Sequence, residues 1–140
     1  MYGQNLPRPF LIEINGKFVA NPDPAQMNET SDGRVPAVMG DRGNAAVFEF
    51  RDGSLRKTGG PDALHFGRHR IEPMAFMPMP VFWIAQREMA QECMFEGDEE
   101  SPTGFKCAGY SINWAPGQGD WIRAFPPEMG LDTRMKLHWQ

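Results

Sequence analysis

Residues Val81–Trp114 read VFWIAQREMAQECMFEGDEESPTGFKCAGYSINW, and the fold prediction rests on this stretch. It opens on Val81–Ile84, the strongest apolar run in the chain, which we expect to lie in the core. The only two cysteines, Cys93 and Cys107, flank the turn-rich segment EGDEESPTG. Their spacing suits one disulfide across a hairpin with an acidic tip, although two buried thiols would also fit it.

The composition favours one all-β domain over residues 1–140. A chain of 140 residues is near the commonest domain size and can bury a substantial core. Its 13 prolines and 15 glycines are too many for a helical protein of this length. They are typical of short strands joined by tight turns.

Glycine turns between apolar runs predict two hairpins, because both turn residues can adopt a positive φ. One joins Phe10–Ile14 to Lys17–Ala20 through Asn15-Gly16, and the other joins Val47–Arg51 to Ser54–Thr58 through Asp52-Gly53. Phe82–Ile84 followed by Cys93–Phe95 resembles a third such unit. Three strand–turn–strand units indicate a pseudo-threefold β-trefoil. A small sandwich or barrel fits the same strands.

The rest of the chain contains one long loop, one or two short strands within Leu64–Phe76, one short helix and three further strands. Residues 21–44 are rich in Pro, Gly, Asn and Asp, which predicts a surface loop. Ala85–Gln91 allows a helix of about two turns at most. Alternation of apolar and polar residues predicts strands at Tyr110–Trp114, Trp121–Phe125 and Met135–Trp139.

Alternation also predicts the centre of the core. Phe48 and Phe50 lie two positions apart, as do Ile112 and Trp114, so each pair shares one face of its strand. We expect both pairs to pack with Trp83 in one core.

The charge of the chain excludes some partners. A net charge of −4 disfavours nucleic acid, because phosphate binding needs clustered Lys and Arg. No apolar stretch approaches the ~20 residues of a membrane span, so no span is expected. No signal-peptide pattern is present at the start, which leaves a cytoplasmic location open beside a secreted one.

The densest group of polar residues contains His65, His69 and Glu72, the candidate catalytic residues. An imidazole and a carboxylate could act as an acid–base pair. In an unbroken strand His65, His69 and Ile71 would share a face, and Ile71 should be buried. We therefore expect both histidines to point inward and Glu72 outward. Satisfied core histidines, or an exposed basic face beside Arg68, are the alternatives.

The sequence predicts neither a metal nor a cofactor. His65 and His69 have no evident third ligand, and the acidic loop Glu96–Glu100 lacks the spacing of an EF-hand. Nucleophile, phosphate-loop and dinucleotide motifs are absent. Met74, Met77 and Met79 could line an adaptable apolar pocket or fill the core.

Four aromatic residues are candidates for ligand binding, because sugars and other flat ligands stack on aromatic rings. They are Trp83, Tyr110, Trp114 and Trp121. In an all-β protein of this size two or three of them belong in the core instead. Asn28-Glu29-Thr30 matches the N-glycosylation acceptor pattern.

Two segments carry a family resemblance. Ala46–Leu55 (AVFEFRDGSL) is one, and Phe82–Ile84 with Cys107 and Tyr110–Trp114 is the other. Over about half of the chain the sequence resembles the fungal PhiA-type secreted cell-wall proteins. The resemblance implies a secreted, β-rich protein of the fungal surface that can carry glycans, without established enzymatic activity.

These observations lead to two functional expectations. The first is a non-catalytic, secreted or cell-wall-associated protein that binds a glycan or a small apolar ligand. The second is a small β-barrel enzyme, of cyclase or isomerase type, acting on an apolar metabolite with a His/Glu acid–base pair. A deep pocket with a histidine or glutamate pointing into it would favour the second. The oligomeric state stays open.

Overall fold

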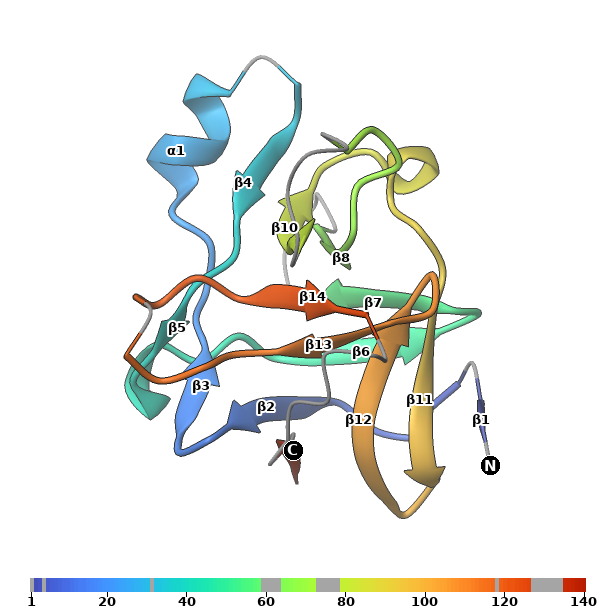
Figure 1. The fold of residues 1–140 in the computed structure, drawn as a ribbon. Coiled ribbons are helices and arrows are strands. Elements are labelled where there is room, and N and C mark those ends of the chain that lie inside the picture. The colour runs from blue at the N-terminus through green and yellow to red at the C-terminus, as the bar shows by residue number, and fades with distance from the viewer. Residues whose placement is uncertain are drawn as a thin grey trace.

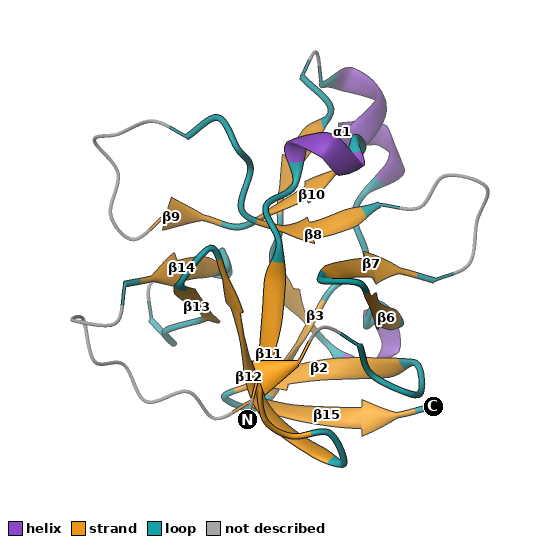
Figure 2. Ribbon diagram, turned by 90° about the vertical axis from the view of Figure 1, so that its right-hand side faces the viewer, coloured by secondary structure: helices purple, strands orange, loops and turns teal. Residues whose placement is uncertain are grey.

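The computed structural model describes residues 2–3, 5–30, 32–58, 64–72, 79–117, 119–126 and 135–140. The described chain consists mostly of antiparallel strands with one α-helix, so the predicted all-β class is confirmed. Two sheets curl into a half-barrel (Figures 1 and 2). This arrangement corresponds to the sandwich or barrel alternative of the prediction.

One sheet has six strands, with the predicted acidic hairpin near its centre. In spatial order they are β1 (Tyr2–Gly3), β11 (Cys93–Asp98), β12 (Ser101–Cys107), β13 (Tyr110–Asn113), β14 (Arg123–Phe125) and β9 (Met79–Pro80). The hairpin register places Cys93 opposite Cys107, and a disulfide joins them with their Cα atoms 4.0 Å apart. The predicted disulfide is confirmed.

The other sheet has nine strands. Eight follow in the order β4 (Arg34–Pro36), β10 (Phe82–Ile84), β8 (His65–Gly67), β7 (Ser54–Lys57), β6 (Phe48–Arg51), β2 (Phe10–Ile14), β3 (Lys17–Val19) and β5 (Met39–Gly40), and β15 (Met135–Trp139) pairs with β2. Both predicted hairpins, β2–β3 and β6–β7, are present. Their turns have positive φ at both central residues, 51° and 90° at Asn15-Gly16 and 50° and 75° at Asp52-Gly53.

The third unit of the predicted repeat does not form. β10 lies between β4 and β8 in the nine-stranded sheet, whereas β11 pairs with β1 and β12 in the six-stranded sheet. The chain between them contains a 3₁₀ turn, η2 (Arg87–Met89), in place of the predicted two-turn helix. The connection leads from one sheet to the other, so its flanking strands cannot pair with each other.

The prediction of a long loop over residues 21–44 is wrong. The segment contains helix α1 (Pro24–Glu29), strands β4 and β5 and a 3₁₀ turn, η1 (Arg42–Asn44). Asp23 caps the helix by accepting a hydrogen bond from the Ala25 N–H over 2.9 Å, and Pro24 occupies its first turn. Within the described part of the chain, no helix has the length and apolar character needed to cross a membrane.

The core lies between the two sheets and is largely aromatic. Phe10 of the nine-stranded sheet stacks on Phe105 of the six-stranded sheet, with ring centroids 5.9 Å apart. Phe48 stacks on Trp83 at 5.4 Å. The predicted core residues all belong to this cluster: Phe48, Phe50, Trp83, Ile112 and Trp114.

Candidate functional site

His65 is buried in β8 and shares a hydrogen bond with Ser54, the first residue of β7. Ser54 Oγ and His65 Nδ1 are 2.9 Å apart, and His65 is 6% exposed. Burial lowers the pKa of His65 below its usual 6.5, and the charges of Arg87 and Arg56 lower it further, against a smaller effect of Glu88. His65 is therefore neutral at pH 7.

His69 is buried just beyond β8, where it forms an isolated bridge with Ala90. The Ile71 N–H donates to His69 Nδ1 over 3.0 Å, which fits the tautomer with its proton on Nε2. Nε2 is buried and has no hydrogen-bond partner among the residues that the structure describes. Burial lowers the pKa of His69, and the charge of Arg34 adds to this shift, so His69 is neutral as well.

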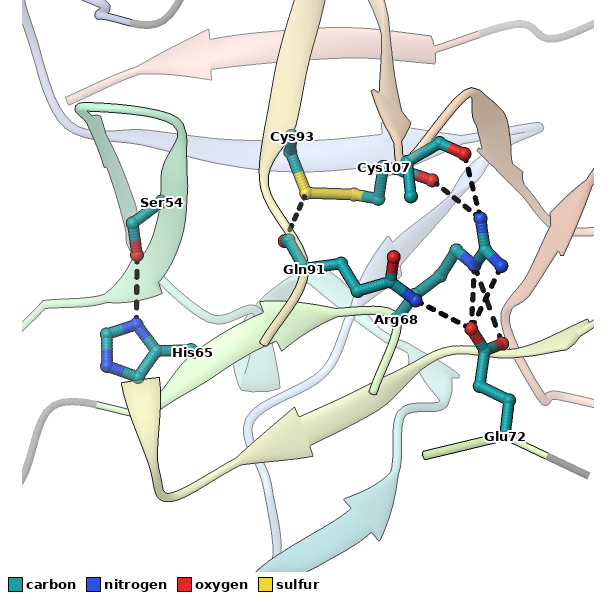
Figure 3. Close-up of a disulfide and its surroundings, with 8 residues drawn as sticks. Ser54, His65, Arg68, Glu72, Gln91, Cys93 and Cys107 are labelled. Carbon is teal, nitrogen blue, oxygen red and sulfur yellow. Dashed lines mark hydrogen bonds and ion pairs between the residues drawn. A yellow bond between two sulfur atoms is a disulfide. The ribbon is translucent and has the colours of Figure 1, made fainter. Parts of the chain in front are cut away.

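Glu72 binds the guanidinium of Arg68 beside the disulfide (Figure 3). Arg68 Nη2 donates to Glu72 Oε1 over 2.9 Å, and Gln91 Nε2 donates to the same oxygen over 2.7 Å. Arg68 Nη1 donates to the carbonyls of Cys107 and Ala108 over 3.2 Å and 2.9 Å. This nearly buried ion pair connects the chain after β8 to the end of β12.

The predicted orientation of residues 65–72 is correct for the two histidines and wrong for Ile71 and Glu72. Ile71 is 64% exposed, and Glu72 packs against Arg68, which is itself buried rather than part of an exposed basic face. β8 ends at Gly67, whose φ of +148° interrupts the alternation on which the prediction relied. A Cβ at this position would lie 3.3 Å from both disulfide sulfurs, so the close approach requires glycine.

Of the three candidate catalytic residues, one lines the polar cavity between the β6–β7 turn and β8. His65 lines this cavity of about 90 Å³, whereas His69 and Glu72 do not. In Figure 3, His65 and Glu72 lie on either side of the disulfide and Gln91. Pockets for metabolite-sized ligands usually measure about 300 Å³ or more. Of the methionines proposed to line an apolar pocket, Met79 is in the core and Met74 and Met77 lie outside the described residues.

Two of the four candidate ligand-binding aromatics are buried, and a third, Tyr110, is half-buried. Trp83 is 1% exposed and cannot present its ring to a ligand. Trp114 is 6% exposed, and its Nε1 donates to the Gly119 carbonyl over 2.8 Å. One face of Tyr110 is covered by the guanidinium of Arg68, 4.1 Å from the ring centroid.

The fourth aromatic, Trp121, is 51% exposed. Its backbone forms a bridge with Val38, and the residues on either side are fixed by hydrogen bonds. The Met39 N–H donates to the Asp120 carbonyl over 2.7 Å, and the Ile122 N–H donates to the Ala37 carbonyl over 3.1 Å. Ile122 is fully buried, so alternation along this segment directs Trp121 outward.

Trp121 directly follows an ion-paired aspartate, and one guanidinium lies near its ring. Lys17 Nζ lies 3.4 Å from Asp120 Oδ1 in an exposed ion pair. The guanidinium of Arg123 is 5.9 Å from the centroid of the Trp121 ring. We call Lys17, Asp120, Trp121 and Arg123 the Trp121 patch. Sequence reasoning found Trp121 but not the contact of Lys17 with Asp120, because those two residues are 103 positions apart.

Two further features bear on ligand binding. Asn28 is exposed in α1, where its side chain is accessible. Beside it lies a mainly apolar groove of about 220 Å³, lined by Pro22, Pro24, Met27, Asn28, Lys57 and Leu64. Within the described ranges, no group of three or more His, Cys, Asp or Glu side chains is placed to hold a metal ion.

Together, the fold and the site define an all-β protein of two curled antiparallel sheets. One disulfide crosses the β11–β12 hairpin, and one tryptophan, Trp121, is exposed. No protein-family model, curated protein or solved structure matches this chain.

Proposed function

We propose that this chain is a non-catalytic, secreted or cell-wall-associated protein that binds a glycan on the Trp121 patch. The observation that carries the proposal is the fixed, outward-facing indole. Among the described residues the exposed large hydrophobic side chains are Ile71, Met94 and Trp121, of which Trp121 alone is aromatic.

The chemistry of the patch suits a sugar. A sugar ring in which the hydroxyls are equatorial has apolar C–H faces that stack on an indole. Asp120 can accept hydrogen bonds from hydroxyls at the rim of such a ring, and Lys17 and Arg123 can donate them. Because the backbone of Trp121 is already fixed, little conformational entropy is lost when the ligand binds.

Three observations support a secreted or wall-associated location. A disulfide is typical of proteins from oxidising compartments. The acceptor Asn28 is exposed, as glycosylation requires. The residues that resemble the fungal cell-wall family include Cys107, which forms that disulfide.

A small apolar ligand is the second candidate, and the groove beside α1 supports it. Met27 and Leu64 supply apolar surface there, and the volume of about 220 Å³ suits a compact ligand. If this groove is the site, Met27→Asp abolishes binding of an apolar fluorescent probe, whereas Trp121→Ala leaves it unchanged.

The glycan proposal is tested by co-sedimentation with insoluble β-glucan, chitin and cellulose. We expect the protein to sediment with at least one of them. Trp121→Ala should weaken that binding at least about tenfold, equivalent to about 1.4 kcal/mol. Ile71→Ala is the matched control, because it removes a comparably exposed side chain outside the patch. Equal binding by Trp121→Ala, or no binding to any of the three polysaccharides, would contradict the proposal.

A further inference from the structure

The cavity beside His65 contains polar and charged groups that the proposed glycan site does not use. It measures about 90 Å³ and lies between the β6–β7 turn, β8 and the chain around η2. Ser54 and His65 line it, together with the exposed Arg70 and Arg87. Such a volume is too small for a metabolite with several rings but sufficient for a few water molecules or one small polyatomic ion.

We propose that this cavity binds a small oxyanion, such as sulfate or a carboxylate group, and that His65 takes up a proton when the anion binds. A tetrahedral or planar oxyanion matches the side chains that line the cavity, two arginines and a serine. Arg70 Nε already donates to the Glu88 carbonyl over 2.7 Å, which leaves the other N–H groups of that guanidinium for an anion. Guanidinium groups are the preferred partners of such anions because their N–H groups bind two oxygens at once.

The position of the charges matters here more than their sum. Asp52 and Glu92 also line the cavity, so its acidic side chains balance Arg70 and Arg87 in number. The charged groups that act on His65 itself are not balanced in this way. Arg87 and Arg56 both disfavour protonation there, and Glu88 opposes them only in part. Of the two arginines that act on His65, Arg87 also lines the cavity, so an anion at this end of the cavity would lie beside that arginine.

The hydrogen bond between Ser54 and His65 links anion binding to protonation. With neutral His65 protonated on Nε2, the Ser54 hydroxyl donates to Nδ1 over 2.9 Å. When Nδ1 is protonated it becomes the donor, and the hydroxyl hydrogen is free to point at an anion. A bound anion in turn offsets the effect of Arg87 on the imidazolium. Anion binding and protonation of His65 therefore each favour the other.

The test is an NMR titration of the histidine side chains in sodium sulfate and in sodium chloride of equal ionic strength. Sulfate keeps a constant charge over the pH range of interest. We expect sulfate to raise the pKa of His65 by about one unit, as a nearby opposite charge does. Sodium acetate is tested in the same way, and a larger shift with one salt identifies the preferred anion.

Variants separate a specific site from a general salt effect. Arg87→Gln and Ser54→Ala should each reduce the sulfate-dependent shift at least several-fold. Arg42→Gln, which removes an exposed arginine at η1, should retain it. Amide spectra show which variants fold, and if Arg87→Gln does not fold, Ser54→Ala decides the outcome. The proposal is overturned if neither anion shifts His65 in the wild type, or if the shift persists in the folded variants of the cavity.

Discussion

Trp83 and Trp121 have the same side chain and opposite environments. Trp83 is 1% exposed and packs its ring on Phe48 and Phe66 at centroid distances of 5.4 Å and 5.3 Å. Trp121 is 51% exposed, beside the fully buried Ile122. The two positions should therefore respond differently to truncation.

Trp83→Ala should lower the free energy of unfolding by about 3–5 kcal/mol, because it leaves a cavity among aromatic rings that cannot fully collapse. Trp121→Ala should change it by no more than about 0.5 kcal/mol. Urea denaturation of the two variants and the wild type measures both values. A Trp83→Ala variant of near-native stability would show that the aromatic cluster does not hold the sheets together.

The two buried histidines should make the protein less stable in acid. Burial lowers the pKa of both His65 and His69 in the folded state, so between their folded and unfolded pKa values the unfolded chain binds more protons. Their contribution is complete above about pH 6.5 and is lost as pH falls below it. Each histidine can contribute a slope of at most about 1.4 kcal/mol per pH unit.

Urea denaturation at about pH 7.5 and about pH 5.5 tests this expectation, since carboxyl groups titrate mainly below that range. The free energy of unfolding should be smaller at the lower pH. His65→Gln and His69→Gln should each reduce the difference. Stability that stays constant or increases on acidification would contradict the burial of two neutral imidazoles.

At the level of elements, the β11–β12 hairpin is tied to the rest of the fold through its base. The disulfide joins Cys93 to Cys107 there, and Gly67 of β8 packs directly against both sulfurs. Arg68 adds one hydrogen bond to the last carbonyl of β12, that of Cys107, and one to the carbonyl of Ala108. The base of the hairpin therefore contacts and holds β8, in addition to closing the loop between Cys93 and Cys107.

Reducing the disulfide should destabilise the fold. Closing a loop of about 15 residues stabilises a protein by about 3 kcal/mol, because it restricts the unfolded chain. We expect the midpoint of urea denaturation to fall by a corresponding amount in the presence of reductant. The double variant Cys93→Ala/Cys107→Ala is the control and should not respond to reductant. An equal response of both proteins would assign the effect to something other than this bond.

Sequence reasoning succeeded at elements whose signals are local. The turns Asn15-Gly16 and Asp52-Gly53 require a positive φ, and both form as predicted. It failed where a tertiary contact decided the outcome. β8 ends at Gly67, where the disulfide of the other sheet approaches the chain, and β10 and β11 separate although their sequences resemble a hairpin. The Asp23-Pro24 start of α1 was a local signal that we overlooked.

At the level of the whole molecule, the candidate site depends on the order of strands in the two sheets. Lys17 comes from the start of β3, whereas Asp120 and Trp121 come from the chain before β14. The sequence named Trp121 as one of four candidate binding aromatics and expected two or three of the four in the core. It could not single out Trp121 from the other three, since its exposure depends on the long-range bridge between Trp121 and Val38.

The most direct test of the glycan proposal follows the indole N–H signals of the four tryptophans during titration with soluble oligosaccharides of β-glucan, chitin and cellulose. Trp121→Phe assigns the Trp121 signal. We expect one of these oligosaccharides to shift the Trp121 signal saturably, and to leave those of Trp83, Trp114 and Trp139 unchanged. If all four signals stay in place with each oligosaccharide, or if the saturable shift occurs at another tryptophan, Trp121 is not a glycan-binding residue.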